Sequence, residues 1–127
     1  MKRALLVVAL AGCGPEVSVV LKASNDGRVI GAAALWSEPN PVDTKTLWTM
    51  ASLRVTDTSI GMYAVGMVHR SRCATLGPPL GGSLEVSPAP NAASSFIRIG
   101  KATDMIGSYA FAVHESTGGP VVACGDL

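Results

Sequence analysis

Residues Tyr109–Asp126 read YAFAVHESTGGPVVACGD. Apolar residues alternate up to His114, a short Ser-Thr-Gly-Gly-Pro segment follows, and a β-branched pair then leads to Cys124. Two such runs around a short, glycine-containing segment are typical of two antiparallel strands joined by a tight turn. The hairpin thus carries one of the two histidines and one of the three cysteines of the chain, and their candidate partners lie upstream.

Length and composition indicate one folded domain. The chain has 127 residues, of which 48% are apolar and 15% are charged, so there is material for a core and little sign of disorder. Its 14 Gly and 8 Pro are scattered singly and in pairs, which indicates many tight turns. The net charge is +1, no basic run occurs and aromatic residues make up only 5%, so no nucleic-acid partner is expected.

The N-terminus has the features of a secretory signal. A basic pair, Lys2-Arg3, precedes an apolar run over residues 4–11, which is too short to span a bilayer because a membrane helix needs about 20 residues. The segment Leu10–Cys13 resembles the lipobox of bacterial lipoproteins, in which the cysteine is lipidated and becomes the new N-terminus. We therefore expect a lipoprotein-type signal peptide over residues 1–12 and a lipid anchor on Cys13. An ordinary cleaved signal, or a loose end before the first strand, is the alternative.

Export would place the chain in the cell envelope, on the periplasmic or extracellular face of a membrane. If Cys13 carries lipid, Cys73 and Cys124 remain as an even pair in an oxidising compartment. A bridge between them would close a loop of about 50 residues and contribute about 4 kcal/mol by the loop-entropy estimate. Two free, buried thiols are the alternative.

Alternating apolar and polar residues predict further strands upstream of the hairpin. Pro39 and Pro41 predict a loop over residues 37–43, because a proline does not fit a central strand, and turn residues predict another loop over residues 70–79. No window has a helical period over three turns. The predicted strands cover residues 16–23, 28–36, 45–55, 59–69, 84–86, 96–99, 109–114 and 121–126. Seven or eight short strands predict an all-β, antiparallel sandwich or barrel, as a single domain over residues 13–127.

Several short segments resemble one protein family, and together they extend over nearly the whole of residues 13–127. They are VLK (20–22) with DGRVIG (26–31), MVH (67–69), CATLGPP (73–79), AVHE (112–115) and ACG (123–125). In these segments the chain resembles the copper–zinc superoxide dismutases, whose domain is a Greek-key β-barrel. The resemblance implies that fold and a disulfide between Cys73 and Cys124.

The metal-binding positions that the resemblance implies are only partly kept. Copper in that family is held by four histidines, and the corresponding positions here are Met67, His69, Pro79 and His114. The region of the zinc ligands corresponds to Gly81–Leu84, which offers none, and the arginine that guides the substrate corresponds to Val121. The resemblance therefore implies no zinc site, an incomplete copper site and no steering charge.

Met67, His69 and His114 remain as candidate copper ligands. Met67 and His69 are two apart on a predicted strand, so their side chains share a face. Cu(II) favours nitrogen and oxygen ligands in a tetragonal arrangement, whereas a soft sulfur ligand favours Cu(I), so a thioether with two imidazoles indicates Cu(I). The alternative is that no metal binds, with both histidines hydrogen-bonded to neighbours and Met67 packed as an apolar side chain.

These observations favour an exported, non-enzymatic cell-envelope protein with a dismutase-like domain that lacks the full catalytic metal site. A Cu(I)-binding or copper-delivery protein that uses His69, His114 and Met67 is the first alternative, and a copper-only superoxide dismutase with weak activity is the second. No catalytic residue is assigned. The spacing justifies no Ser-His-acid triad, and no glycine-rich loop leads into a helix to bind phosphate.

Overall fold

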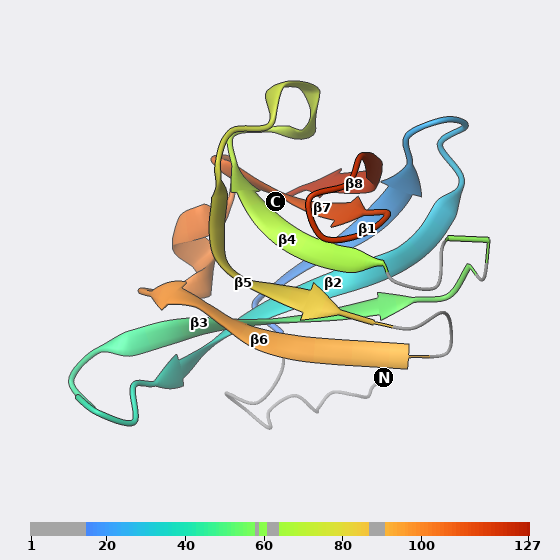
Figure 1. Cartoon of the computed structure of the whole chain (residues 1–127). Helices are drawn as coiled ribbons and strands as arrows, with labels where there is room; N and C mark the ends of the chain where they lie inside the picture. Colours follow the sequence, from blue (N-terminus) through green and yellow to red (C-terminus); the bar gives the residue numbers. More distant parts are fainter. Residues whose placement is uncertain (1–14, 58, 61–63, 87–90) are drawn as a thin grey trace, which may run out of the picture.

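The computed structural model describes residues 15–57, 59–60, 64–86 and 91–127, and these form eight β-strands and two short 3₁₀ helices (Figure 1). The all-β, antiparallel class predicted from the sequence is confirmed. The elements are β1 (Val17–Ala23), β2 (Val29–Pro39), β3 (Leu47–Val55), β4 (Val65–Arg70), η2 (Cys73–Thr75), β5 (Pro79–Glu85), β6 (Asn91–Ile99), η3 (Ala102–Met105), β7 (Tyr109–His114) and β8 (Val121–Asp126).

The strands form one hydrogen-bonded sheet in the order β5-β4-β7-β8-β1-β2-β3-β6. The sheet curls so that its two end strands, β5 and β6, lie side by side, which makes it a nearly closed barrel (Figure 1). Strands β4, β5 and β6 follow one another around the barrel, and β7 returns to pair with β4 on its other side. This spatial order, with the fourth strand beside the first, is that of a Greek key.

The seam between β5 and β6 depends on two glycines. A Cβ added at Gly81 would overlap the carbonyl oxygen of Ile97 and lie 2.7 Å from the Cα of that residue, and one added at Gly82 would lie 2.6 Å from Ser95 Oγ. Glycine therefore lets the two end strands approach where any side chain would hold them apart. Since glycines give no hydrophobic pattern, the sequence predicted a strand only from residue 84, whereas β5 begins at Pro79.

Every strand contributes a buried apolar side chain to the interior, and η3 covers one end with Ala102 and Met105. The largest of these side chains is Phe111 of β7, which is fully buried. Burial of a large apolar side chain contributes about 1.5–3 kcal/mol, so this core is the main source of stability. One buried side chain from each strand, in chain order, is Leu21, Leu35, Leu53, Val68, Leu84, Ile97, Phe111 and Ala123.

The predicted loop over residues 37–43 was wrong at its start, because β2 continues to Pro39, in register with Leu47. The Asn40 N–H points toward β3 and donates to Thr46 O, so the backbone nitrogen of residue 39 points the other way, toward the side of β1. On that side β1 begins only at Val17, which pairs with Leu35. The lack of an N–H in proline therefore costs the sheet no hydrogen bond at this position.

Two other strand boundaries differ from the prediction by more than two residues. The predicted strand over residues 59–69 was too long, since β4 begins at Val65; residues 61–63 lie outside the described ranges. Strand β6 begins at Asn91 rather than at residue 96, because the segment Ala92–Ser95 has only small side chains and therefore no hydrophobic alternation. Its pairing with β3, rather than its own pattern, makes this segment a strand.

Gly81→Ala is expected to destabilise the protein more than Gly107→Ala. The φ angles are +80° and +84°, so alanine at either position costs about 1–2 kcal/mol of backbone strain. An added Cβ at Gly107 meets nothing within 4 Å, whereas at Gly81 it would overlap β6 and add roughly 1–3 kcal/mol of overpacking. Urea unfolding of both variants measures the difference. Equal losses would contradict the close approach of β5 and β6.

Candidate metal centre

The predicted ligands share the outer face of β4 and β7. Val68 and Phe111 point into the core and are fully buried, so the alternating neighbours Met67, His69 and His114 point outward. Cross-strand pairing places Val65 opposite His114 and His69 opposite Ala110. Although His69 and His114 face away from the core, their exposed fractions are only 8% and 9%. Other parts of the chain therefore cover this face.

The connection from β4 to β5 provides part of this cover and is held by a covalent bond. Cys73 in η2 forms a disulfide with Cys124 of β8, with the two Cα atoms 6.0 Å apart, which confirms the predicted bridge. The Cys73 N–H also donates to Asp126 Oδ1 at 2.6 Å, and Arg72 Nη1 donates to Leu127 O at 2.7 Å. The loop is thus held to residues 124–127 at three points.

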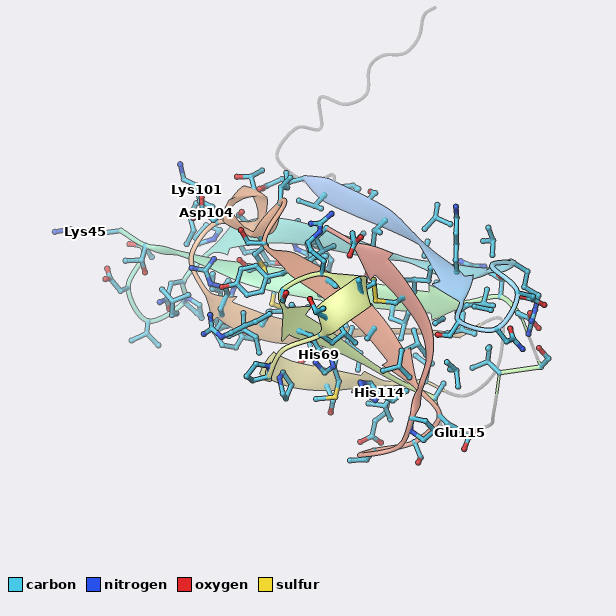
Figure 2. All side chains as sticks on the ribbon, turned by 90° about the horizontal axis from the view of Figure 1, so that it is seen from above. Lys45, His69, Lys101, Asp104, His114 and Glu115 are labelled. Carbon is cyan, nitrogen blue, oxygen red and sulfur yellow. A yellow bond between two sulfur atoms is a disulfide. The ribbon has the colours of Figure 1, made fainter. Side chains whose placement is uncertain are left out.

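The structure brings the two histidines together. His69 Nε2 and His114 Nε2 are 2.9 Å apart, and the ring planes are inclined by 28° with centroids 5.1 Å apart (Figure 2). His69 Nδ1 lies 2.8 Å from Gly77 O in the disulfide-bonded loop, and His114 Nδ1 lies 2.8 Å from Gly119 O in the turn between β7 and β8. Each ring is therefore held at both nitrogens.

The two carbonyl contacts determine where the protons are. A carbonyl oxygen can only accept a hydrogen bond, so the Nδ1 of each histidine carries a proton. In a neutral imidazole the other nitrogen, Nε2, is then an acceptor with a free lone pair. The two Nε2 atoms are 2.9 Å apart, the distance of an N–H···N hydrogen bond, so the contact is favourable when a proton is shared between them. A metal ion bound by both nitrogens at about 2 Å would lie to one side of the line that joins them.

Met67 is half-buried on the same face, diagonal to His114 across the β4–β7 pair. Diagonal neighbours of this kind are within reach of long side chains. The other positions implied by the resemblance are near the pair but bear no ligand: Pro79 pairs with His69 and Val121 pairs with His114. Among the described residues, no group of three or more His, Cys, Asp and Glu side chains is placed to hold a metal.

The role of the Gly77 and Gly119 carbonyl groups could not be predicted from the sequence, because every residue type has a backbone oxygen. The predicted lipidation site, Cys13, lies outside the described residues. No helix within the described ranges is long and apolar enough to cross a bilayer.

A cavity of about 240 Å³ at one end of the barrel is a separate feature, lined in part by Arg28, Ser59 and Glu115. Arg28 donates to Asp57 at 2.7 Å and to Asp26 at 2.8 Å, so its charge is satisfied by its neighbours. Hydrogen bonds from Ser59 and Arg28 lower the pKa of Asp57 from 3.8 to about 2. This cluster joins the β1–β2 turn to the segment after β3, and we assign it a structural role.

Comparisons with models of protein families, with curated proteins and with solved structures find no match to this chain.

Removal of the disulfide is expected to destabilise the fold by about 4 kcal/mol, because the bridge closes a loop with a sequence separation of 51. The variant is Cys73→Ser with Cys124→Ser, in a protein that also carries Cys13→Ser so that no thiol remains. Urea unfolding compares it with the Cys13→Ser protein. Reductant should lower the stability of the latter to that of the triple variant; a Cys13→Ser protein insensitive to reductant would contradict the bridge.

Asp57→Asn is expected to change the acid sensitivity of the fold. The folded-state pKa of Asp57 is about 2, below the ordinary 3.8, so its ionised form stabilises the protein above the ordinary value. That contribution is lost as pH falls from 3.8 through about 2. The difference in unfolding free energy between wild type and variant should therefore shrink over this window. A difference that is constant with pH would show that Asp57 has no such role.

Proposed function

We propose that this protein is an exported, lipid-anchored domain of superoxide dismutase-like fold that binds one copper ion through His69 and His114. In this proposal it holds or delivers copper and is not an efficient dismutase. The convergence of the two Nε2 atoms carries the proposal. The N-terminal signal pattern and the disulfide, which is typical of oxidising compartments, support the export that it requires.

The contacts behind the histidines fit a metal site. Histidines that bind metals almost always donate their second ring N–H to a carboxylate, a backbone carbonyl or water, which fixes the tautomer and the ring orientation. Here Gly77 O and Gly119 O accept from the two Nδ1–H groups at 2.8 Å. Both Nε2 atoms could therefore bind a metal ion in place of their contact with each other, and the burial of the rings limits their motion.

Copper suits this donor set better than zinc. Structural zinc sites normally use four cysteine or histidine ligands, and the described residues offer two imidazoles with the thioether of Met67 on the same face. Imidazole and thioether are ligands of Cu(I). A bound copper ion would supply one-electron chemistry, while His69 and His114 would orient it and the covering loop would exclude water.

The surroundings of the pair argue against rapid turnover of superoxide. Pro79 and Val121, beside His69 and His114, provide neither a further ligand nor a charge that attracts an anion. The segment Gly81–Leu84, in which the resemblance would place zinc ligands, forms part of β5, and its glycines contact β6. This segment thus closes the barrel by packing against β6.

Titration of Cu(I) and of Cu(II), against a competing chelator, tests the proposal. We expect one Cu(I) ion per protein, with affinity lowered more than about 10-fold by His69→Gln or His114→Gln, since even outer partners of a ligand contribute 10–100-fold. Met67→Leu should weaken Cu(I) more than Cu(II), because the thioether is the soft ligand. Met50→Leu, on a different face of the barrel, is the matched control and should change neither affinity.

Two results would overturn parts of the proposal. If no copper binds, or if neither histidine substitution alters its affinity, the pair is a proton-sharing structural contact. If the copper-loaded protein consumes superoxide faster than the same amount of free copper, the carrier role is wrong and the protein is an enzyme.

A further inference from the structure

Large apolar side chains gather on the outer face of β2, β3 and β6. Thr49 and Ala51 are fully buried inside the barrel, so the alternating residues Trp48 and Met50 point outward. Their partners on the neighbouring strands complete what we call the aromatic patch, whose members are Trp36, Trp48, Met50, Phe96 and Ile99. It contains both tryptophans of the chain.

The members of the patch contact one another and remain partly open to solvent. The rings of Trp48 and Phe96 have centroids 4.8 Å apart, and Ile99 is 52% exposed. Trp36 Nε1 donates to Glu38 at 2.6 Å. Trp48 Nε1, by contrast, is buried and has no hydrogen-bond partner within the described part of the chain. A surface of partly exposed tryptophan and aliphatic side chains is typical of sites where a protein meets a membrane interface.

The described chain begins next to β2, at the residues that flank Trp36. The Glu16 N–H donates to Leu35 O at 2.8 Å, and the Glu16 carboxylate accepts from the Ser37 N–H and hydroxyl at 3.0 and 2.8 Å. Residues 35 and 37 flank Trp36, so the N-terminus is fixed beside the patch. Cys13 is two residues before Pro15. An extended chain spans at most about 3.6 Å per residue, so the two-residue connection from Pro15 to a lipid on Cys13 could be no longer than about 7 Å.

We infer that the aromatic patch rests on the surface of the bilayer when the chain is anchored. This inference rests on the lipid anchor at Cys13 in the proposed function. Each polar headgroup layer is only about 5–7 Å thick, so a two-residue tether holds the barrel end directly against the interface. Trp36 of the patch lies between the two residues of β2 that bind Glu16, and indole rings favour this depth of the membrane.

The charges near the patch are mixed. Lys45 and Lys101 lie at this end of the barrel together with Asp104 (Figure 2), and Glu16 and Glu38 add negative charge beside the patch. No single sign dominates, so docking depends on apolar and aromatic contact and should be insensitive to salt.

Docking in this way would orient the metal centre. In the closed order of eight strands, β3 is opposite β7 and β2 is opposite β4. With β2, β3 and β6 on the membrane, the outer face of β4 and β7 points away from it. His69 and His114 would then face the aqueous compartment, from which copper comes or to which it is delivered.

Tryptophan fluorescence tests the inference directly, because Trp36 and Trp48 are the only tryptophans. The lipidated chain is reconstituted in phosphatidylcholine vesicles with and without lipids brominated near the headgroup end of the acyl chains. We expect a blue shift and quenching by the brominated lipid that persist at high salt. Ile99→Asp should reduce the quenching at least twofold. The matched control is Val29→Asp, at a 57% exposed position near the other end of β2, and should leave it unchanged.

Failure of docking and failure of the anchor give different results. If cells do not label Cys13 with palmitate, that thiol can be coupled to a maleimide lipid, because Cys73 and Cys124 are bonded to each other. With either tether, emission and quenching equal to those of the untethered Cys13→Ser protein would overturn the inference. Quenching that disappears at high salt would also overturn it, as would a Cys13→Ser dimer that Ile99→Asp dissociates, since a second copy would then occupy the patch. Copper binding by the untethered Cys13→Ser protein is measured independently, so the result on docking does not decide the result on copper.

Discussion

The covalent bond between Cys73 and Cys124 holds the loop on which the histidine pair depends. It ties η2 to β8 beside the outer face of β4 and β7. Farther along the same loop, Gly77 O accepts the hydrogen bond that fixes the ring of His69. The orientation of the His69 ring thus depends on a cross-link at Cys73, which is four residues from both His69 and Gly77. His114 is fixed from the other side by the short turn after β7.

The sequence predicted most of this barrel because apolar alternation is strong wherever a strand packs on the core, as in β1, β3 and the closing hairpin. It failed where something other than apolar alternation makes the strand. Gly81 and Gly82 allow β5 to approach β6 closely, and Pro39 lies where the strand needs no N–H donor. For the candidate metal centre, spacing placed Met67 and His69 on one face. The 2.9 Å contact between the rings could not be predicted, since it is created by backbone carbonyls of two loops.

The barrel separates two surfaces with different chemistry. One side has a buried, hydrogen-bonded pair of histidines under a cross-linked loop, and the opposite side has aromatic and apolar side chains next to the N-terminus. A β-sheet makes this division simple, because each strand directs alternate side chains outward. The shared core then holds both surfaces at a fixed relative orientation.

The glycine seam has a consequence for the motions of the molecule. Neighbouring strands elsewhere are joined by backbone hydrogen bonds, but β5 and β6 are the two ends of the sheet, and within the described residues no ladder joins them. Separation of these strands breaks no ladder, so the lowest-energy local opening should occur there, with early amide hydrogen exchange in both strands. Opening would expose two sheet edges that could pair with another chain. Strands β4 and β7 would stay paired throughout, so the histidines would remain together while the barrel opens.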